Sequence, residues 1–277
     1  MIYPDRHNTL VVVVTYNPDI DFVSHLNRYV EIAEKSLIVD NNSAFNIKEL
    51  VCEPLHSYFE FLLSKENKGI AWGLNQGILY ALENGYSYIL TLDQDSLPLK
   101  NILEIYGEFL KDKEGIGLIG TSFLEKIDKD TVNNNVFKSK LSVITSGTLH
   151  SVEIFSQVGL YNEKLFIDSV DFEFSLRVKK AGYKVLRSTI PFLEHHLGSP
   201  ISRYGIKSSN HNAIRRYYMT RNHIYVTKKF FKSFPWWIIK KNVHFAYSIL
   251  IFLIVEKQKK EKIKEILRGV NDGFALQ

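Results

Sequence analysis

Short, mostly apolar segments recur through the first part of the chain. Four of them are present, at residues 9–14, 36–39, 58–63 and 88–92. The first has no polar alternation, which predicts a strand covered on both faces as in a parallel sheet, and the other three predict further strands of the same sheet. Apolar residues at helical spacing predict helices over residues 19–34 and 70–82, and Asn84-Gly85 predicts a left-handed cap on the second helix.

The second half of the chain is less regular. Residues 115–120 and 183–188 predict two more strands, and residues 171–181 have a helical pattern that ends at Gly182. The alternation of strands and helices favours one α/β domain over residues 1–202, with a nucleotide-binding sheet flanked by helices.

Polar and acidic residues follow the predicted strands where they end. They form four clusters: residues 15–17, Asp40, Asp93 with Asp95, and Asp168 with Asp171 and Glu173. A single Asp-x-Asp is typical of a solvated turn, but carboxylates after successive buried strands favour an active site, because open α/β sheets bind ligands at that edge. Asp93 and Asp95 suit a hard divalent cation that also holds substrate phosphates.

The charge of the chain is divided unevenly. Residues 1–202 carry 19 basic and 26 acidic side chains, and residues 203–277 carry 16 basic and 4 acidic. The last 75 residues therefore form a basic extension, which predicts an anionic partner: phosphate, nucleic acid or a lipid surface.

An apolar run of 13 residues, 243–255, lies in this extension. It is shorter than the roughly 18 to 20 residues that span a bilayer. Flanking lysines and the pair Trp236-Trp237 favour a helix at a membrane interface, and a buried core helix is the open alternative. The N-terminus lacks a secretory pattern and Cys52 is the single cysteine, so we expect a cytoplasmic protein.

Several motifs together carry a family resemblance. They are Val14-Thr-Tyr-Asn17, Val39-Asp-Asn-Asn-Ser43, Asn67-Lys-Gly-Ile-Ala71 with Asn75, Leu90-Thr-Leu-Asp-Gln-Asp-Ser96, Phe166-Ile-Asp-Ser-Val-Asp-Phe-Glu173, His195 with Leu197-Gly198, and Tyr217-Tyr218 with Arg221-Asn222. With these motifs the sequence resembles the family 2 glycosyltransferases and, within them, the bacterial rhamnosyltransferases. The resemblance covers nearly the whole chain and implies a GT-A-like mixed sheet.

The resemblance also implies a donor site and its metal. The residues that would face the nucleotide sugar are Thr15, Tyr16, Asn17, Asp40, Asn67, Lys68, Gly69, Asn75, Asp93 and Arg221. Asp95 would hold Mg²⁺ or Mn²⁺ on the diphosphate, with Asp93 beside it and His195 near the metal. Lys68 as a surface lysine and His195 as a structural histidine are the open alternatives.

The acidic cluster near residue 170 would supply the base of an inverting transfer. The resemblance assigns this role to Asp171, with Asp168 as the competitor. Glu173 would bind the acceptor or brace the base. The alternative is a helix N-terminus that carries acids because they suit the helix dipole.

The implied activity is transfer of L-rhamnose from dTDP-L-rhamnose to a glycan or a lipid-linked glycan, by a peripheral protein on the inner face of the plasma membrane. The alternatives are a different nucleotide sugar, such as a galactosyl donor, and a nucleotidyltransferase. A Gly-rich basic triphosphate loop is missing near the first strand, which disfavours the latter. The apolar run and the tryptophans also disfavour nucleic acid as the partner of the extension.

Overall fold

The computed structural model describes residues 2–124, 137–195, 201–203 and 205–277. The chain forms two compact units: Met1–Lys164 with Phe174–His196, and Leu165–Glu173 with Leu197–Gln277. The first unit carries the main sheet, and the second is mostly helical. The predicted domain boundary at residue 202 stays a prediction.

The first unit is built on a mixed sheet. Its parallel part has the order β3-β2-β1-β4, formed by β1 (Thr9–Thr15), β2 (Ser36–Asp40), β3 (Phe59–Leu63) and β4 (Tyr88–Asp93). The order then continues β8-β6-β9-β5, with β7 on β9; the bounds are β5 (Ser96–Pro98), β6 (Ile116–Leu124), β7 (Phe137–Ser139), β8 (Thr148–Ser151) and β9 (Lys184–His195). β8 is antiparallel to β4 and to β6. The predicted mixed α/β sheet is confirmed.

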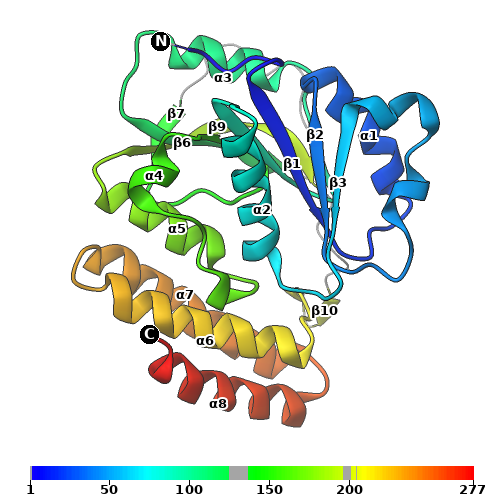
Figure 1. Ribbon diagram of the computed structural model, residues 1–277. Helices are drawn as coiled ribbons and strands as arrows, with labels where there is room; N and C mark the ends of the chain where they lie inside the picture. Colours follow the sequence, from blue (N-terminus) through cyan, green and yellow to red (C-terminus); the bar gives the residue numbers. More distant parts are fainter. Residues whose placement is uncertain (1, 125–136, 196–200, 204) are drawn as a thin grey trace. The chain divides into compact units, whose positions relative to one another are not determined.

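Helices cover both faces of the parallel strands (Figure 1). Val11 and Val13 belong to the same core as α1 (Asp21–Ile32) and α3 (Ile102–Leu110). Val12 and Val14 point the other way, since side chains alternate along a strand, and meet α2 (Ile70–Glu83). The predicted helices 19–34 and 70–82 are therefore α1 and α2, whereas α3, β5 and β8 have no counterpart in the sequence pattern.

Two glycines bring α2 into direct contact with β1. A Cβ atom on Gly77 would lie 2.4 Å from Cγ1 of Val12, and one on Gly73 would lie 2.6 Å from Cγ1 of Val14. The close approach fixes the start of α2, and with it the preceding residues 67–69, at the carboxyl ends of β1 and β2.

The second unit packs three helices with a small hairpin. They are α6 (Ala213–Phe230), α7 (Pro235–Val255), α8 (Lys259–Ala275), β10 (Ile201–Arg203) and β11 (Ile206–Ser208). α8 runs beside α6 (Figure 1), where a Cβ on Gly269 would lie 2.7 Å from the carbonyl oxygen of Tyr217. The other α-helices of the described residues are the short α4 (Ile154–Val158), which belongs to the first unit, and α5 (Val170–Lys180), whose residues are divided between the two units.

A buried ionic cluster joins α6, the end of α7, and α8. The carboxylate of Glu256, which follows α7, accepts hydrogen bonds from Arg216 of α6 at 2.5 Å and from Lys262 of α8 at 2.7 Å. All three side chains are buried, and the two cations hold the pKa of Glu256 below its usual value against the effect of burial. Arg216 is thus a structural ion-pair partner in the core of its unit.

α7 is longer than the apolar run from which it was anticipated. The run begins at Val243, but the helix begins at Pro235, a residue suited to the first helical position. Among the described residues, α7 is the one helix whose 21 residues and mean hydropathy of 1.6 would allow it to cross a membrane by length and composition alone. The length argument against spanning is therefore wrong.

Gly77→Ala should destabilise the protein by about 1–3 kcal/mol, because overpacking against Val12 exceeds the gain in helix propensity. In a Val12→Ala background the new methyl group has room, so the penalty should shrink. Chemical denaturation of the two single variants and the double variant measures this coupling. Additive effects of the two substitutions would show that the helix does not rest on β1 at this point.

Candidate active site

Asp40 organises the loops that follow β1 and β2. Its Oδ1 accepts hydrogen bonds from Thr15 Oγ1 at 2.9 Å and Ser43 Oγ at 2.6 Å, and its Oδ2 accepts the backbone N–H of Ser43 at 2.8 Å. Asn17, with φ of 46°, donates its N–H to Ser43 Oγ at 2.7 Å. Three of the residues predicted to face the nucleotide thus form one hydrogen-bonded network at the sheet edge.

The loop before α2 is tied to the same edge. Asn41 donates from its side chain to the carbonyl of Gly69 at 3.0 Å and accepts the N–H of Lys68 at 3.3 Å. Asn67 Oδ1 accepts the N–H of Gly69, whose φ is 84°. The Lys68 ammonium lies 5.1 Å from the centre of the Trp72 ring.

Asn75, in the second turn of α2, binds the segment that contains Tyr161 and Glu163. It donates to the carbonyl of Tyr161 at 3.0 Å and to Glu163 Oε1 at 2.8 Å, and accepts the N–H of Tyr161. Because Asn75 is buried, its amide holds this stretch of backbone in place.

Asp93 and Asp95 lie in the turn between β4 and β5. Ser146 Oγ accepts the N–H of Asp93 at 3.0 Å and donates to Ser96 Oγ at 2.7 Å. Gln94, between the two acids, accepts the N–H of Tyr16 at 2.8 Å. This bond joins the exit of β1 to that of β4, a role that the sequence did not reveal.

The two carboxylates act on a shared neighbour. Together with burial, the charges of Asp95 and Asp93 raise the pKa of Tyr29. Two like charges at one sheet edge, with serine hydroxyls beside them, are a hard oxygen donor set that suits Mg²⁺ or Mn²⁺ when substrate phosphates complete the coordination. Among the described side chains no group of three or more His, Cys, Asp or Glu forms a metal cluster.

His195 ends β9, where its backbone pairs with Ser96, the neighbour of Asp95. Its side chain, like residues 196–200, lies outside the described part of the chain. The register brings the residue to the acidic turn, and its predicted role stays a prediction.

The acids near residue 170 belong to the second unit, in the segment Leu165–Glu173. Phe166, Asp168 and Ser169 have φ values of 63°, 64° and 61°, so the backbone is left-handed at three non-glycine positions. Asn222, fully buried on α6, donates to the carbonyls of Leu165, Ile167 and Asp168 at 2.7, 2.7 and 2.9 Å.

Arg221 supports the same segment. Its Nη2 donates to the Leu165 carbonyl at 3.1 Å and its Nε to Asn222 Oδ1 at 2.9 Å. The guanidinium lies 4.8 Å from the ring centre of Tyr218, which stacks on Phe166. Arg221 was predicted to reach the donor diphosphate, which stays a prediction.

The three acids differ in their partners. Asp168 pairs with Arg215 at 3.3 Å, and the buried Glu173 pairs with Lys229 at 2.7 Å. Asp171 Oδ1 accepts the N–H of Phe172 at 2.8 Å, and burial raises the pKa of Asp171 to about 7. Asp171 is thus the acid of the segment that is poised to exchange a proton near neutral pH.

Lys241 of α7 opposes this rise. Its positive charge lowers the pKa of Asp171, while the negative charge of Asp168 raises it. The ammonium lies 3.7 Å from the centre of the Phe172 ring, and Trp237 contacts the same ring edge-on at 5.8 Å. Burial in turn lowers the pKa of Lys241.

The sequence motifs include Tyr218 and Asn222 but did not assign these roles, and they did not single out Arg215, Tyr225 or Lys229. Arg215, Tyr218, Asn222, Tyr225 and Lys229 recur at intervals of three and four along α6, which is the spacing of one helix face. A polar and aromatic face of this kind within a basic segment is the signal that could have identified them.

The chain matches no family model. It is 30% identical, over an alignment of 301 residues, to the dTDP-rhamnosyl transferase RfbF of Shigella flexneri, covering 96% of this chain and 95% of that protein. The chain belongs to the bacterial rhamnosyltransferase branch of the family 2 glycosyltransferases.

Solved structures with the same fold are GT-A glycosyltransferases. S. aureus TarS 1-349 in complex with UDP-GlcNAc has a TM-score of 0.59 at 11% identity, covering 98% of this chain and 73% of that chain. GalNAc-T7, solved with UDP, GalNAc and Mn²⁺, has a TM-score of 0.59 at 14% identity, and the match covers 83% of this chain and 49% of the GalNAc-T7 chain. This chain thus spans about half of the GalNAc-T7 chain.

The enzyme class follows from these findings. The protein is a glycosyltransferase that takes its sugar from a nucleotide-sugar donor. The GT-A fold is confirmed. A nucleotidyltransferase is therefore no longer an alternative.

Replacing Lys241 by Met should raise the pKa of Asp171 above about 7, because a charge that favours the carboxylate is lost. At neutral pH a smaller fraction of Asp171 is then ionised. Carbon-13 NMR titration of the side chain, assigned with Asp171→Asn, measures the shift. The matched control is Lys240→Met, an exposed lysine one position earlier, which should change the pKa little. An unchanged or lowered pKa in Lys241→Met would refute the electrostatic contact.

Proposed function

We propose that this glycosyltransferase transfers L-rhamnose from dTDP-L-rhamnose to a hydroxyl group of a glycan, with inversion at the anomeric carbon. The donor assignment is supported by the relative named dTDP-rhamnosyl transferase, which the chain matches over 95% of its length. A galactosyl or other nucleotide sugar is the competing donor.

In the proposed donor site, Thr15, Tyr16, Asn17 and Asp40 bind the nucleotide. The network around Asp40 supports this role, because it fixes the strand exits before any ligand arrives. Residues 67–69 and Asn75 complete the site, with Lys68 and Arg221 contributing positive charge toward the diphosphate.

Asp95 is the proposed metal ligand, with Asp93 on the sugar side and His195 as a further ligand. Mg²⁺ or Mn²⁺, when bound, supplies Lewis-acid stabilisation of the departing diphosphate. The hydrogen bonds of Ser96 and Ser146 support the proposal, since they hold the acidic turn in one conformation.

Asp171 is the proposed base, and the ion pairs of its neighbours carry this assignment. Asp168 and Glu173 are paired with Arg215 and Lys229, whereas Asp171 has a pKa of about 7. The Asp171 carboxylate takes the proton of the acceptor hydroxyl as its oxygen attacks the anomeric carbon. The bond from that carbon to the diphosphate breaks, and its electrons leave with dTDP. Glu173, held by Lys229, braces the segment.

We further propose that residues 1–202 are the catalytic domain and that residues 203–277 bring it to the inner face of the plasma membrane. The excess of 16 basic over 4 acidic side chains in the extension supports an anionic lipid surface as the partner. The acceptor is then a lipid-linked glycan, and the route is the synthesis of a cell-surface polysaccharide.

A panel of nucleotide sugars, each with Mg²⁺, Mn²⁺ or chelator, tests donor and metal together. Hydrolysis or transfer should be fastest with dTDP-L-rhamnose and should fall on chelation. Asp95→Asn should remove the response to metal, and Asp112→Asn, which changes an exposed acid of the same unit, should not. Turnover that survives chelation would end the role given to Asp95, and faster turnover with a galactosyl donor would replace L-rhamnose.

Asp171→Asn should lower kcat by about 10²–10⁴-fold, the usual worth of a general base, and leave binding of dTDP nearly unchanged. Asp168→Asn is the matched control and should retain most of the activity. In the wild type, kcat/KM should rise with pH and level off above about 7, because the carboxylate is the active form. If Asp168→Asn lost the activity and Asp171→Asn kept it, the base would be Asp168.

A further inference from the structure

One face of α7 is apolar and exposed along the whole helix. The exposed fractions are Trp236 83%, Ile239 42%, Val243 66%, Tyr247 57%, Leu250 53%, Leu253 39% and Ile254 39%. These positions recur at intervals of three and four, so they form one stripe about 30 Å long, here called the outer face of α7. Exposed apolar surface of this extent marks an interaction site.

The opposite face fixes the helix on its unit. Ile238, Phe252 and Val255 are buried. Asn242 Oδ1 bonds to the His223 ring at 2.7 Å and accepts from Thr227 at 3.1 Å, and Phe245 stacks on His223 at 4.3 Å. These contacts with α6 fix the rotation of α7 about its axis, and the apolar stripe is therefore left exposed.

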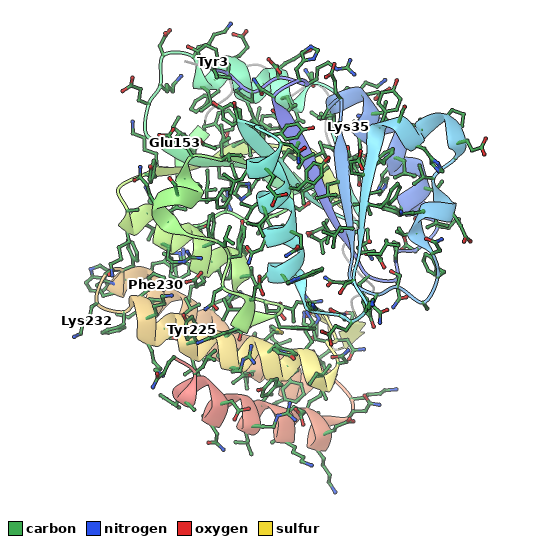
Figure 2. All side chains as sticks on the ribbon, in the orientation of Figure 1. Tyr3, Lys35, Glu153, Tyr225, Phe230 and Lys232 are labelled. Atoms are coloured by element: carbon green, nitrogen blue, oxygen red, sulfur yellow. The ribbon has the colours of Figure 1, made fainter. Side chains whose placement is uncertain are left out.

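The charges around the outer face have one sign. From residue 204 to residue 260 the sequence contains a single acid, Glu256, and it is buried in its ionic cluster. Exposed lysines stand at both ends of the helix: Lys232 and Lys240 near its start, and Lys257, Lys259 and Lys260 after its end. Lys232 extends from the turn before α7 into solvent (Figure 2). An apolar stripe between cationic ends is complementary to anionic phospholipid: acyl chains for the stripe, head groups for the lysines.

The face of α7 that contacts its own unit also determines whether the helix could cross a bilayer or lie parallel to its surface. A spanning helix would place Lys241 and Asn242 in hydrocarbon and would break their contacts with Phe172 and His223. A helix lying in the plane of the interface keeps these contacts and immerses the stripe alone.

We propose that the outer face of α7 is the surface by which the protein docks, parallel to the membrane, on anionic phospholipid. The inference rests on the proposed membrane location and is independent of the proposed sugar chemistry. It adds which residues enter the lipid and which stay with the protein.

Co-sedimentation with vesicles of phosphatidylglycerol and phosphatidylcholine in equal parts tests the proposal, with vesicles of phosphatidylcholine alone for comparison. The full-length protein should bind the anionic vesicles more tightly, and added salt should weaken the binding. Ile239→Ser with Val243→Ser and Leu250→Ser should weaken it at least about tenfold, because three inserted side chains become polar.

The matched control changes the same number of exposed apolar residues on α8: Ile263→Ser, Leu267→Ser and Phe274→Ser. It should bind vesicles as the wild type does. Both variants should keep the circular dichroism spectrum and the donor hydrolysis of the wild type, which separates loss of docking from misfolding and from failure of the proposed chemistry.

Equal loss in the two variants would overturn the assignment to α7. The proposal would also be overturned if the wild type did not bind anionic vesicles and sedimented as a dimer while the α7 variant was a monomer. That result would make the outer face a contact between two copies of the chain.

Discussion

The amide of Asn222 holds a backbone that local preference opposes. Three non-glycine residues between Phe166 and Ser169 adopt left-handed φ values, each at a cost of roughly 1–2 kcal/mol. Asn222 offsets this cost by donating to three carbonyls of the segment, and Arg221 adds a fourth hydrogen bond. The acids of the segment owe their positions to this one buried side chain, because α5 begins directly after the backbone that it fixes.

Once the backbone is fixed, ion pairing distinguishes three chemically similar carboxyl groups. Asp168 pairs with Arg215 at 3.3 Å, and the buried Glu173 pairs with Lys229 at 2.7 Å. Asp171 meets burial and a more distant ammonium, and these opposing effects bring its pKa to about 7. The difference between the acids therefore lies in the helices that pack around them and not in residue type.

Elements with an apolar pattern of their own could be predicted from the sequence, whereas elements defined by distant partners could not. β1 could be predicted because burial on both faces makes its five central residues, 10–14, apolar, and α2 because its apolar positions repeat. β5 and β8 could not, since strands of three and four residues are defined by pairing with β9 and β4 and leave no pattern of their own. The start of α7 was missed because counting apolar residues stops at Asn242, whereas backbone hydrogen bonding continues back to Pro235.

For the candidate site, the sequence could suggest Asp40, Asp93 and Asp95 because they stand where predicted strands end. The expectation that the acids near residue 170 also follow a strand was wrong, since they follow a 3-10 turn at Glu163–Leu165 and a left-handed backbone segment. The partners of these acids could not be identified, because Lys229 and Lys241 follow Asp171 by more than fifty residues and their spacing looks like an ordinary basic surface. Gln94 was similarly hidden, since its bond to the N–H of Tyr16 depends on the parallel pairing of β1 with β4.

The thickness of α7 sets the distance between the apolar stripe on one face and the residues next to Asp171 on the other. Phe172, next to Asp171, contacts Trp237 and Lys241 on one side of the helix, and the apolar stripe lies on the other. A helix is about 10–12 Å across with its side chains, so a lipid surface at the outer face lies about one helix diameter from the carboxyl group of Asp171. A docked helix would then act as a spacer of that thickness between the lipid surface and the Asp171 carboxyl group.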